Sequence, residues 1–260
     1  MNRRSMLTAL GASALVSSEG QGATPPNTFL ALQTWRLHNS AEGQGARLAE
    51  YLEHGLVPAL ARAGAKLCGA FANIIAPDGP YYVTLAEYAS LAGFGTAVAE
   101  LRTNGAHRAA LEKLNAGAGA PFVRMESSLL RSFDKMPAAV LTDPADKHAP
   151  RIFELRTYES PSFVALTRKV GMFNDAEMGI FERLGMRPVF FGETVVGPRQ
   201  PNLTYMLSYD DLAARDALWR AFGKDPEWAK LRVRPGLTDP EIVANISNVI
   251  LRPLPFSAIR

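Results

Sequence analysis

The sequence predicts an α+β fold: two tandem ferredoxin-like domains whose antiparallel sheets pack into one intramolecular α/β barrel. Two observations predict it. Residues of the first half recur in the second at a spacing of 121 positions, and both halves follow the order strand, helix, strand, strand, helix, strand. A four-stranded sheet with helices on one face leaves its other face uncovered, so two such sheets can cover each other.

The repeat is clearest at residues that punctuate turns. Glycine and proline fix backbone geometry, so their recurrence indicates matched turns rather than shared composition. The opening strands need a slip of two positions, which a loop absorbs. The residues that recur are Arg62 and Arg183, Gly64 and Gly185, Pro77 and Pro198, Pro80 and Pro201, Tyr88 and Tyr209, Leu91 and Leu212, and Arg131 and Arg252.

Each half opens with a predicted strand and a long amphipathic helix. The strands are expected at 29–37 and 152–158, and apolar residues at helical spacing predict helices at 45–63 and 162–184. Pro58 lies inside the first helix and should kink or divide it. Gly64 and Gly185 suit the position just past a helix C-terminus, where φ is often positive.

A hairpin, a second helix and a closing strand complete each half. Proline-containing turns separate the expected hairpin strands, because proline cannot continue a strand ladder. Acidic residues favour a helix start at Asp210, and proline is tolerated in the first turn of a short helix beginning at Asp225. The expected ranges are 66–75, 81–88, 90–102 and 122–130 in the first half, and 188–196, 203–209, 210–222 and 246–251 in the second.

These elements predict four regions. Residues 1–27 form an export signal and spacer, 28–133 the first domain, 134–150 a proline-rich linker, and 151–260 the second domain. Paired arginines at Arg3 and Arg4 precede a weakly apolar run, which resembles a twin-arginine signal and predicts a periplasmic or secreted protein. The alternative is a basic leader without consequence, on a cytoplasmic protein. The cleavage site is not fixed by the sequence.

Composition excludes several classes of protein. The chain is 47% hydrophobic and 20% charged, values typical of a folded soluble protein. A net charge of +3 does not indicate a nucleic-acid surface, and the longest apolar runs are too short for a transmembrane segment. The single cysteine, Cys68, excludes an internal disulfide framework and favours a core position.

Four segments of the second half resemble the NIPSNAP family. They are Phe153 to Tyr158, Leu207 to Leu212, Asp225 to Trp228 and Val249 to Leu254. The first half matches loosely, with Asn104 to His107 where the second half has Asp-Pro-Glu-Trp. The resemblance implies the dimeric α/β-barrel fold, shared with small monooxygenases, isomerases and some haem enzymes. It brings no agreed activity, substrate or catalytic residues.

Strand alternation supplies the ligand-binding candidates. Glu154, Arg156 and Tyr158 fall on one face of their strand, and we expect that face to point into the barrel. Gln33 and Trp35 are the matching residues of the first half. Together these side chains would line a mixed apolar and polar cavity, as in many small-molecule sites. The alternative is that the charged residues pair and seal the interface between the sheets.

Further candidates lie at strand ends. Arg252, with Arg131 as its equivalent, could bind a carboxylate through its guanidinium, although a solvated strand-end charge is the more ordinary interpretation. Tyr88 and Tyr209 could donate hydrogen bonds or simply pack under the helices.

No motif indicates a cofactor or a metal. The sequence has neither a phosphate-binding glycine loop nor a nucleophile elbow, and its four histidines lack metal-ligand spacing. The sequence therefore leaves two functions open. One is a module that binds a small apolar or aromatic molecule or a protein partner, with homo-oligomerisation possible. The other is a cofactor-independent monooxygenase or isomerase acting inside the barrel. Substrate and catalytic residues stay unknown.

Overall fold

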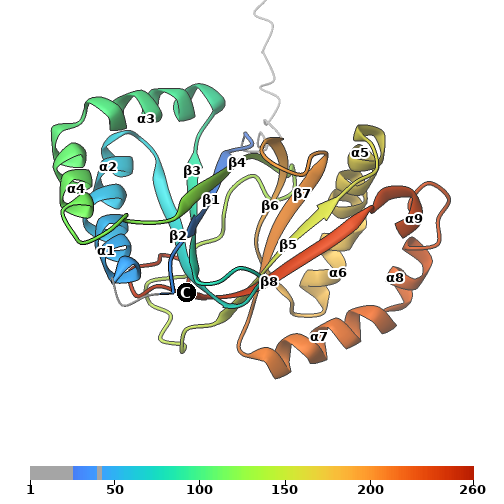
Figure 1. Ribbon diagram of the computed structural model, residues 1–260. Coiled ribbons are helices and arrows are strands. Elements are labelled where there is room, and N and C mark those ends of the chain that lie inside the picture. Colours follow the sequence, from blue (N-terminus) through green and yellow to red (C-terminus); the bar gives the residue numbers. More distant parts are fainter. Residues whose placement is uncertain (1–25, 40–42) are drawn as a thin grey trace, which may run out of the picture.

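The computed structural model describes residues 26–39 and 43–260 as a closed antiparallel β-barrel with helices on its outside (Figure 1). The predicted export signal lies outside the described residues. Around the barrel the strands follow the order β1-β3-β2-β8-β5-β7-β6-β4. Their bounds are β1 Phe29–Arg36, β2 Lys66–Ile75, β3 Tyr81–Tyr88, β4 Arg124–Ser132, β5 Ile152–Glu159, β6 Arg187–Val196, β7 Asn202–Tyr209 and β8 Asn245–Pro253.

The strand order repeats between the two halves. The first half contributes β4-β1-β3-β2 and the second β8-β5-β7-β6, each the order of a ferredoxin-like sheet. Antiparallel pairs β2 with β8 and β4 with β6 join the two sheets and close the barrel. The predicted barrel is thus confirmed, while the division into two tandem domains stays a prediction.

Helices cover the outer face of the barrel on both flanks (Figure 1). The first half carries α1 Gln44–Tyr51, the π-helical turn η1 Leu52–Leu56, α2 Val57–Arg62, α3 Leu91–Thr103 and α4 Gly105–Asn115. The second half carries α5 Phe163–Met172, the π-helical turn η2 Phe173–Glu177, α6 Met178–Arg183, α7 Leu212–Lys224, α8 Pro226–Leu231 and α9 Asp239–Ile242.

The first helix of each half is interrupted at the same place. In the first half, α2 follows η1 directly, and Pro58 is the second residue of α2. The equivalent turn η2 occurs without any proline, so Pro58 alone does not explain the interruption. The glycines that follow both helices have positive φ, 73° at Gly64 and 79° at Gly185, as predicted.

Other equivalent positions also share their geometry. The hairpin turns place Asp78 and Arg199 at φ 55° and 60°. Asn104 and Asp225 both cap the helix that follows: the Asn104 side chain accepts a hydrogen bond from one backbone N–H group of the first turn, and that of Asp225 from two. The loosely matching segment at Asn104 therefore keeps the local structure of its counterpart although its sequence differs.

Three hydrophobic cores stabilise the molecule. One fills the middle of the barrel, and the other two lie between the barrel and the helices of each half. Buried residues of the barrel interior include Leu30, Phe71, Phe153, Phe190, Met206 and Leu251. Burial of large side chains of this kind contributes roughly 1.5–3 kcal/mol each.

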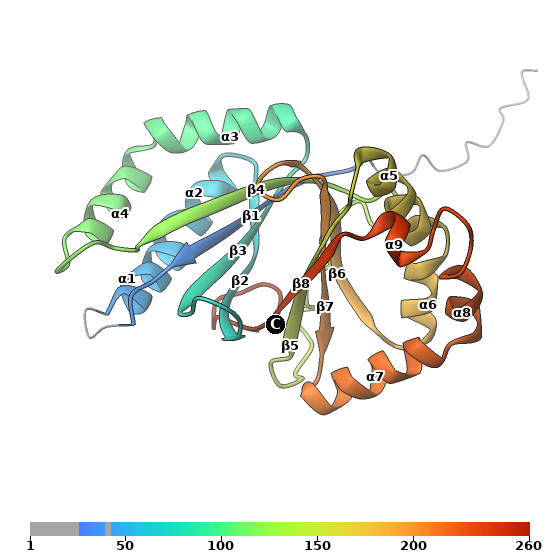
Figure 2. The same ribbon diagram turned by 45° about the vertical axis from the view of Figure 1, so that its right-hand side comes forward.

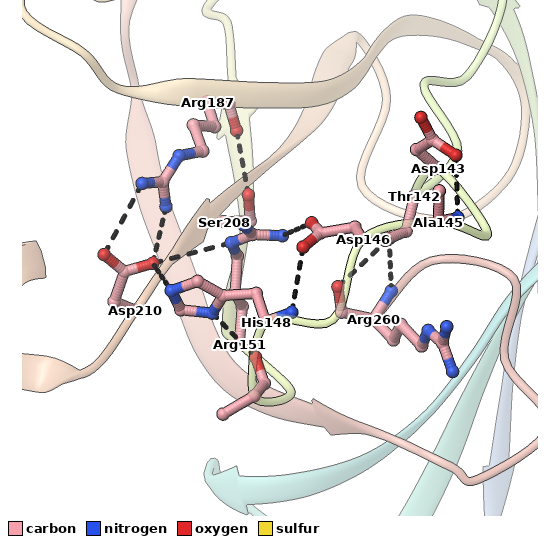
Figure 3. Close-up of polar contacts among 11 residues, drawn as sticks. Thr142, Asp143, Ala145, Asp146, His148, Arg151, Arg187, Ser208, Asp210 and Arg260 are labelled. Atoms are coloured by element: carbon pink, nitrogen blue, oxygen red, sulfur yellow. Dashed lines mark hydrogen bonds and ion pairs between the residues drawn. The ribbon is translucent and has the colours of Figure 1, made fainter.

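The predicted linker closes one end of the barrel rather than running free between the halves. Leu141 packs against the interior core, and the Thr142 backbone bonds to that of Ala258 near the C-terminus. The end of the linker lies beside Asp210, whose carboxylate is 3.8 Å from Nε2 of His148 and 3.5 Å from Nε of Arg151 (Figure 3). Asp210 also accepts hydrogen bonds from Arg187 at 2.8 and 3.4 Å. The opposite end, where the hairpin turns lie, is left open.

Candidate functional site

The second-half candidates point away from the barrel interior, which corrects the expected facing of β5. Phe153 and Leu155 belong to the interior core, whereas Glu154 bonds to residues of the outer helix α7. Both faces of this sheet are covered, one by the opposite sheet and one by helices. Alternation separates the two sets correctly, but it does not say which covered face each set occupies.

The first-half candidates lie on the outer face as well. Trp35 makes edge contacts with Tyr51 and Phe122, and its Nε1 donates to Oγ1 of Thr84 at 3.2 Å. That hydroxyl in turn lies 3.4 Å from Oε1 of Gln33. These residues belong to the packing between sheet and helices rather than to a cavity.

The strand-end arginines are exposed to solvent. Arg252 points outward from β8, and Arg131 donates to Asp134 at 3.1 Å. Tyr88 and Tyr209, in contrast, are buried beneath the helices. The structure therefore favours packing roles for the tyrosines, and it does not bring Arg252 into contact with the other candidates.

The second-half candidates nevertheless meet in one buried polar network. The fully buried Glu154 accepts hydrogen bonds from Arg156 at 2.8 Å, from Arg215 at 2.6 and 3.1 Å, from Trp219 at 2.8 Å and from Asn248 at 2.9 Å. Burial alone would raise the pKa of the Glu154 carboxyl. The hydrogen bonds from Arg215, Trp219 and Asn248 and the charge of Arg156 outweigh burial and hold that pKa below its usual value.

Tyrosines extend this network under the helices. Arg156 donates to the hydroxyl of Tyr158 at 3.1 Å, and Tyr205 donates to the same oxygen at 3.0 Å. The guanidinium of Arg156 also lies 4.5 Å from the ring of Trp219. The first half has Ala31 at the position of Glu154, so this network belongs to the second half alone.

A second buried ion pair lies beside the network. Nζ of Lys169 is 2.9 Å from Oε2 of Glu177, and the two side chains are only 1% and 2% exposed. Complete burial raises the pKa of Glu177 against the opposing charge of Lys169. The equivalent positions of the first half are Leu48 and Leu56. Two apolar residues therefore replace the ion pair in the equivalent interrupted helix.

The open end of the barrel holds a pocket of about 470 Å³. This volume lies within the range of small-molecule sites. Apolar side chains of the interior face form part of its lining, and hydroxyl and charged groups form the rest. The apolar residues include Leu32, Val83, Leu155 and Val249, and the polar ones include Thr34, Arg36, Asp78, Tyr81, Glu126, Ser128, Thr157, Arg199, Asn202, Thr204 and Ser247.

Both halves contribute to this pocket through equivalent positions. In the ring of eight strands β1 and β5 lie four places apart, so they face each other across the barrel. Leu32 therefore stands opposite Leu155, and Thr34 opposite Thr157. Lining residues from β3 pair in the same way with those from β7, and Glu126 and Ser128 of β4 with Ser247 and Val249 of β8. The pocket has an approximate twofold symmetry that follows from the repeat.

The arginines at the mouth are held in place by neighbouring side chains. Nε of Arg36 lies 3.3 Å from Oε2 of Glu126, and its guanidinium lies 4.6 Å from the centre of the Tyr81 ring. On the opposite side Arg199 donates to the hydroxyl of Ser247 at 3.1 Å. Burial raises the pKa of Tyr81, with Arg36 acting against it, so this phenol is a neutral hydrogen-bonding group at neutral pH.

The pocket lining combines apolar contacts with hydroxyl and amide groups, which suits binding and orientation of a small molecule. Among residues 26–39 and 43–260, no group of three or more His, Cys, Asp or Glu side chains is placed to hold a metal ion. Within the same ranges no helix is long and apolar enough to cross a membrane.

Cys68 is a buried core residue, and burial raises the pKa of its thiol to about 12. The thiol is therefore protonated at neutral pH and is a poor nucleophile.

The pocket residues were not among the sequence-based candidates, because the face of β5 that carries Leu155 and Thr157 points into the barrel and the face that carries Arg156 does not. A usable signal was present. Thr34 and Thr157 follow Leu32 and Leu155 at the same spacing in both opening strands, and this matched pattern is what the two facing walls require.

Comparisons with known proteins agree with this architecture. The NIPSNAP family model matches residues 153–258, so this part of the chain is a NIPSNAP domain. The second half is therefore the clearer match to the family, as the sequence predicts. No curated protein matches the chain.

Among solved structures, a "putative monooxygenase" from Lactobacillus acidophilus NCFM superposes with a TM-score of 0.58 at 10% identity, over 87% of this chain and 94% of that chain. An anthrone oxidase-like protein gives a TM-score of 0.52 at 9% identity, over 89% and 93%. A NIPSNAP-like domain protein from Burkholderia xenovorans aligns at 23% identity over 42% of this chain and 90% of its own, with a TM-score of 0.38. At 10% and 9% identity, the likeness to the first two structures is one of fold alone.

Proposed function

We propose that this protein, whose residues 153–258 form a NIPSNAP domain, binds a small amphipathic molecule with an apolar or aromatic body in the open mouth of its barrel. The observation that carries the proposal is the 470 Å³ pocket, which combines an apolar floor with a polar rim. A filled barrel would leave no such space, whereas this barrel is filled in the middle and closed at one end only.

The floor favours a flat apolar body. Leu32 and Leu155 approach from opposite walls, with Val83 and Val249 between them around the ring. Contact with these four side chains removes apolar surface of the ligand from water, which is worth about 25 cal/mol per Å² before the costs of binding.

The rim favours neutral oxygen substituents. Thr34, Ser128 and Ser247 supply hydroxyl groups that can donate or accept hydrogen bonds. Arg36 is paired with Glu126, and the lining carries two arginines (Arg36 and Arg199) and two carboxylates (Asp78 and Glu126), so the charges of the rim balance and do not demand a charged ligand. A phenol or ketone on an aromatic body fits this combination.

A tandem arrangement accounts for the pocket. We propose that 28–133 and 151–260 are two ferredoxin-like domains, because the strand order repeats between them and each supplies one wall. Association into homo-oligomers stays a prediction, which light scattering coupled to size-exclusion chromatography would test.

Binding of 2-naphthol, followed by calorimetry, tests the site. Thr157→Trp should fill the mouth and weaken 2-naphthol binding at least tenfold. Thr167→Trp is the matched control, because Thr167 is exposed on α5 and its hydroxyl bonds only to the helix backbone at Phe163. If both tryptophan variants bind 2-naphthol as the parent does, the barrel mouth is not the site. Circular dichroism verifies that both variants are folded.

A second candidate function is a cofactor-independent monooxygenase or isomerase acting in the same pocket. It is favoured by the two fold neighbours named as a monooxygenase and an anthrone oxidase-like protein. Anthrone is the direct probe: oxidation would consume one O₂ per anthrone and release anthraquinone and water. Oxygen uptake with anthrone that Thr157→Trp abolishes would support this activity, and no uptake above that of the buffer would contradict it.

A further inference from the structure

The first half carries a second hollow, on its outer surface and away from the barrel mouth. It lies between the helix formed by α1 and η1 and the neighbouring helix α4, which run side by side on the outside of the molecule (Figure 2). Its volume is about 410 Å³, also within the range of small-molecule sites. None of the residues that line it belongs to the barrel mouth.

Close contacts bound this groove at both ends. At one end η1 and α4 touch, because a Cβ on Gly55 would lie 2.7 Å from that of Ala110. At the other end Arg47 crosses to the loop after α4 and covers Gly117, where a Cβ would lie 2.0 Å from Nη1. Between these two contacts the walls are mainly apolar and include Tyr51 and Leu114. His54 also lines the groove, with its Nε2 3.8 Å from Oε2 of Glu53.

The repeat explains why the groove belongs to the first half. In the second half the residues at the equivalent position form α9, which packs against α5. In the first half those residues, 118–121, form an irregular loop with bends, and Arg47 reaches it by donating to the carbonyl oxygens of Ala118 at 2.9 Å and Ala120 at 3.2 Å. A loop covers less of the preceding helix than a helical turn does.

The groove has an excess of positive charge. Arg47 and Lys113 line it together with a single carboxylate, Glu50, which pairs with Lys113. In addition, Nε and Nη1 of Arg47 are buried and have no hydrogen-bond partner. Buried donors without an acceptor are costly, so a guanidinium in this state favours a nearby anion.

We propose that this groove binds a small carboxylate whose body is apolar or aromatic. The apolar body lies between Tyr51 and Leu114, and the carboxylate meets the cationic rim formed by Arg47 and Lys113. The first half then has a binding role of its own and is more than a wall of the barrel. This proposal is independent of the one for the barrel mouth, which favours a neutral molecule.

Calorimetry with phenylacetate and its neutral isostere phenylacetamide tests the proposal on the full chain. Two exposed rim residues provide variants with opposite expected signs. Glu50→Gln removes the competing carboxylate and should tighten phenylacetate binding about two- to fivefold, whereas Lys113→Gln should weaken it by a similar factor. Phenylacetamide should bind more weakly and respond to neither change.

Two controls separate this site from the barrel mouth. Lys224→Gln changes an exposed lysine at the end of α7 and should leave phenylacetate binding unchanged, as should Thr157→Trp in the barrel mouth. The proposal is overturned if phenylacetate shows no saturable binding, if the amide binds as tightly, if the two rim variants shift affinity in the same direction, or if Thr157→Trp removes the binding.

Discussion

The buried pair of Lys169 and Glu177 allows a sharp test, because the first half shows the apolar alternative at the same positions. Leu48 and Leu56 occupy these places in the equivalent interrupted helix and are themselves buried. We therefore compare Lys169→Leu, Glu177→Leu and the double change to leucine.

Each single change should be strongly destabilising. With both side chains almost fully buried, removal of one partner leaves an uncompensated charge, which costs about 3–5 kcal/mol of unfolding free energy. Loss of Lys169 also removes an ammonium 4.6 Å from the ring of Phe173, a contact worth about 0.5–2 kcal/mol.

The double change should restore most of the stability. Replacing a buried ion pair by apolar residues ranges from neutral to about 4 kcal/mol stabilising, so the coupling energy between the two positions should reach about 3 kcal/mol or more. Urea unfolding of the four proteins, followed by circular dichroism, measures this cycle. Single changes that cost less than about 1 kcal/mol would contradict a strongly coupled buried ion pair, and so would a double change that costs the sum of the two single changes.

Three further predictions concern residues of the second half and the predicted export signal. Glu154→Gln leaves the guanidinium groups of Arg156 and Arg215 without their carboxylate and should destabilise the fold by roughly 3 kcal/mol in urea unfolding; a change within error would show that the network is dispensable. The pKa of Asp225 is lowered to about 2, chiefly by the hydrogen bond from Arg183 and by those from backbone N–H groups. Because a lowered carboxyl pKa stabilises the folded state above the unfolded value of about 3.9, this contribution should be lost as pH falls from about 4 to about 2. Melting temperatures measured over that range should fall less steeply for Asp225→Asn than for the parent, and equal slopes would contradict the assignment. Replacing Arg3 and Arg4 by lysine should keep the protein inside the cytoplasm in bacterial fractionation, and undiminished export would exclude a twin-arginine route.

The architecture could be predicted from the sequence because it depends on turns and on a repeat. The two halves have matching turns, marked by Gly64 with Gly185 and by Pro80 with Pro201. Matching turns connect the strands in the same way, so both halves form sheets of the same strand order. Two sheets of the same strand order, each with one bare face, close into the barrel that the structure shows.

The site could be predicted only in part, for a physical reason. In most sheets the face with polar side chains is exposed to solvent. Here the polar residues Glu154 and Arg156 lie under the helices, where Glu154 bonds to partners on α7. Phe153 and Leu155 point into the barrel interior instead. Those partners, above all Arg215, lie about sixty residues further along the chain, so local alternation carries no information about them. The groove beside Arg47 depends on a loop in place of a helical turn, which spacing alone does not reveal.

A crystal structure of the protein with bound 2-naphthol would show whether the barrel mouth is the binding site. We expect one ring in the barrel mouth, held between Leu32 and Leu155 with its hydroxyl at the rim near Thr34 or Thr157. A ring found instead on the outer face of β5, displacing Trp219 from the polar network, would contradict it.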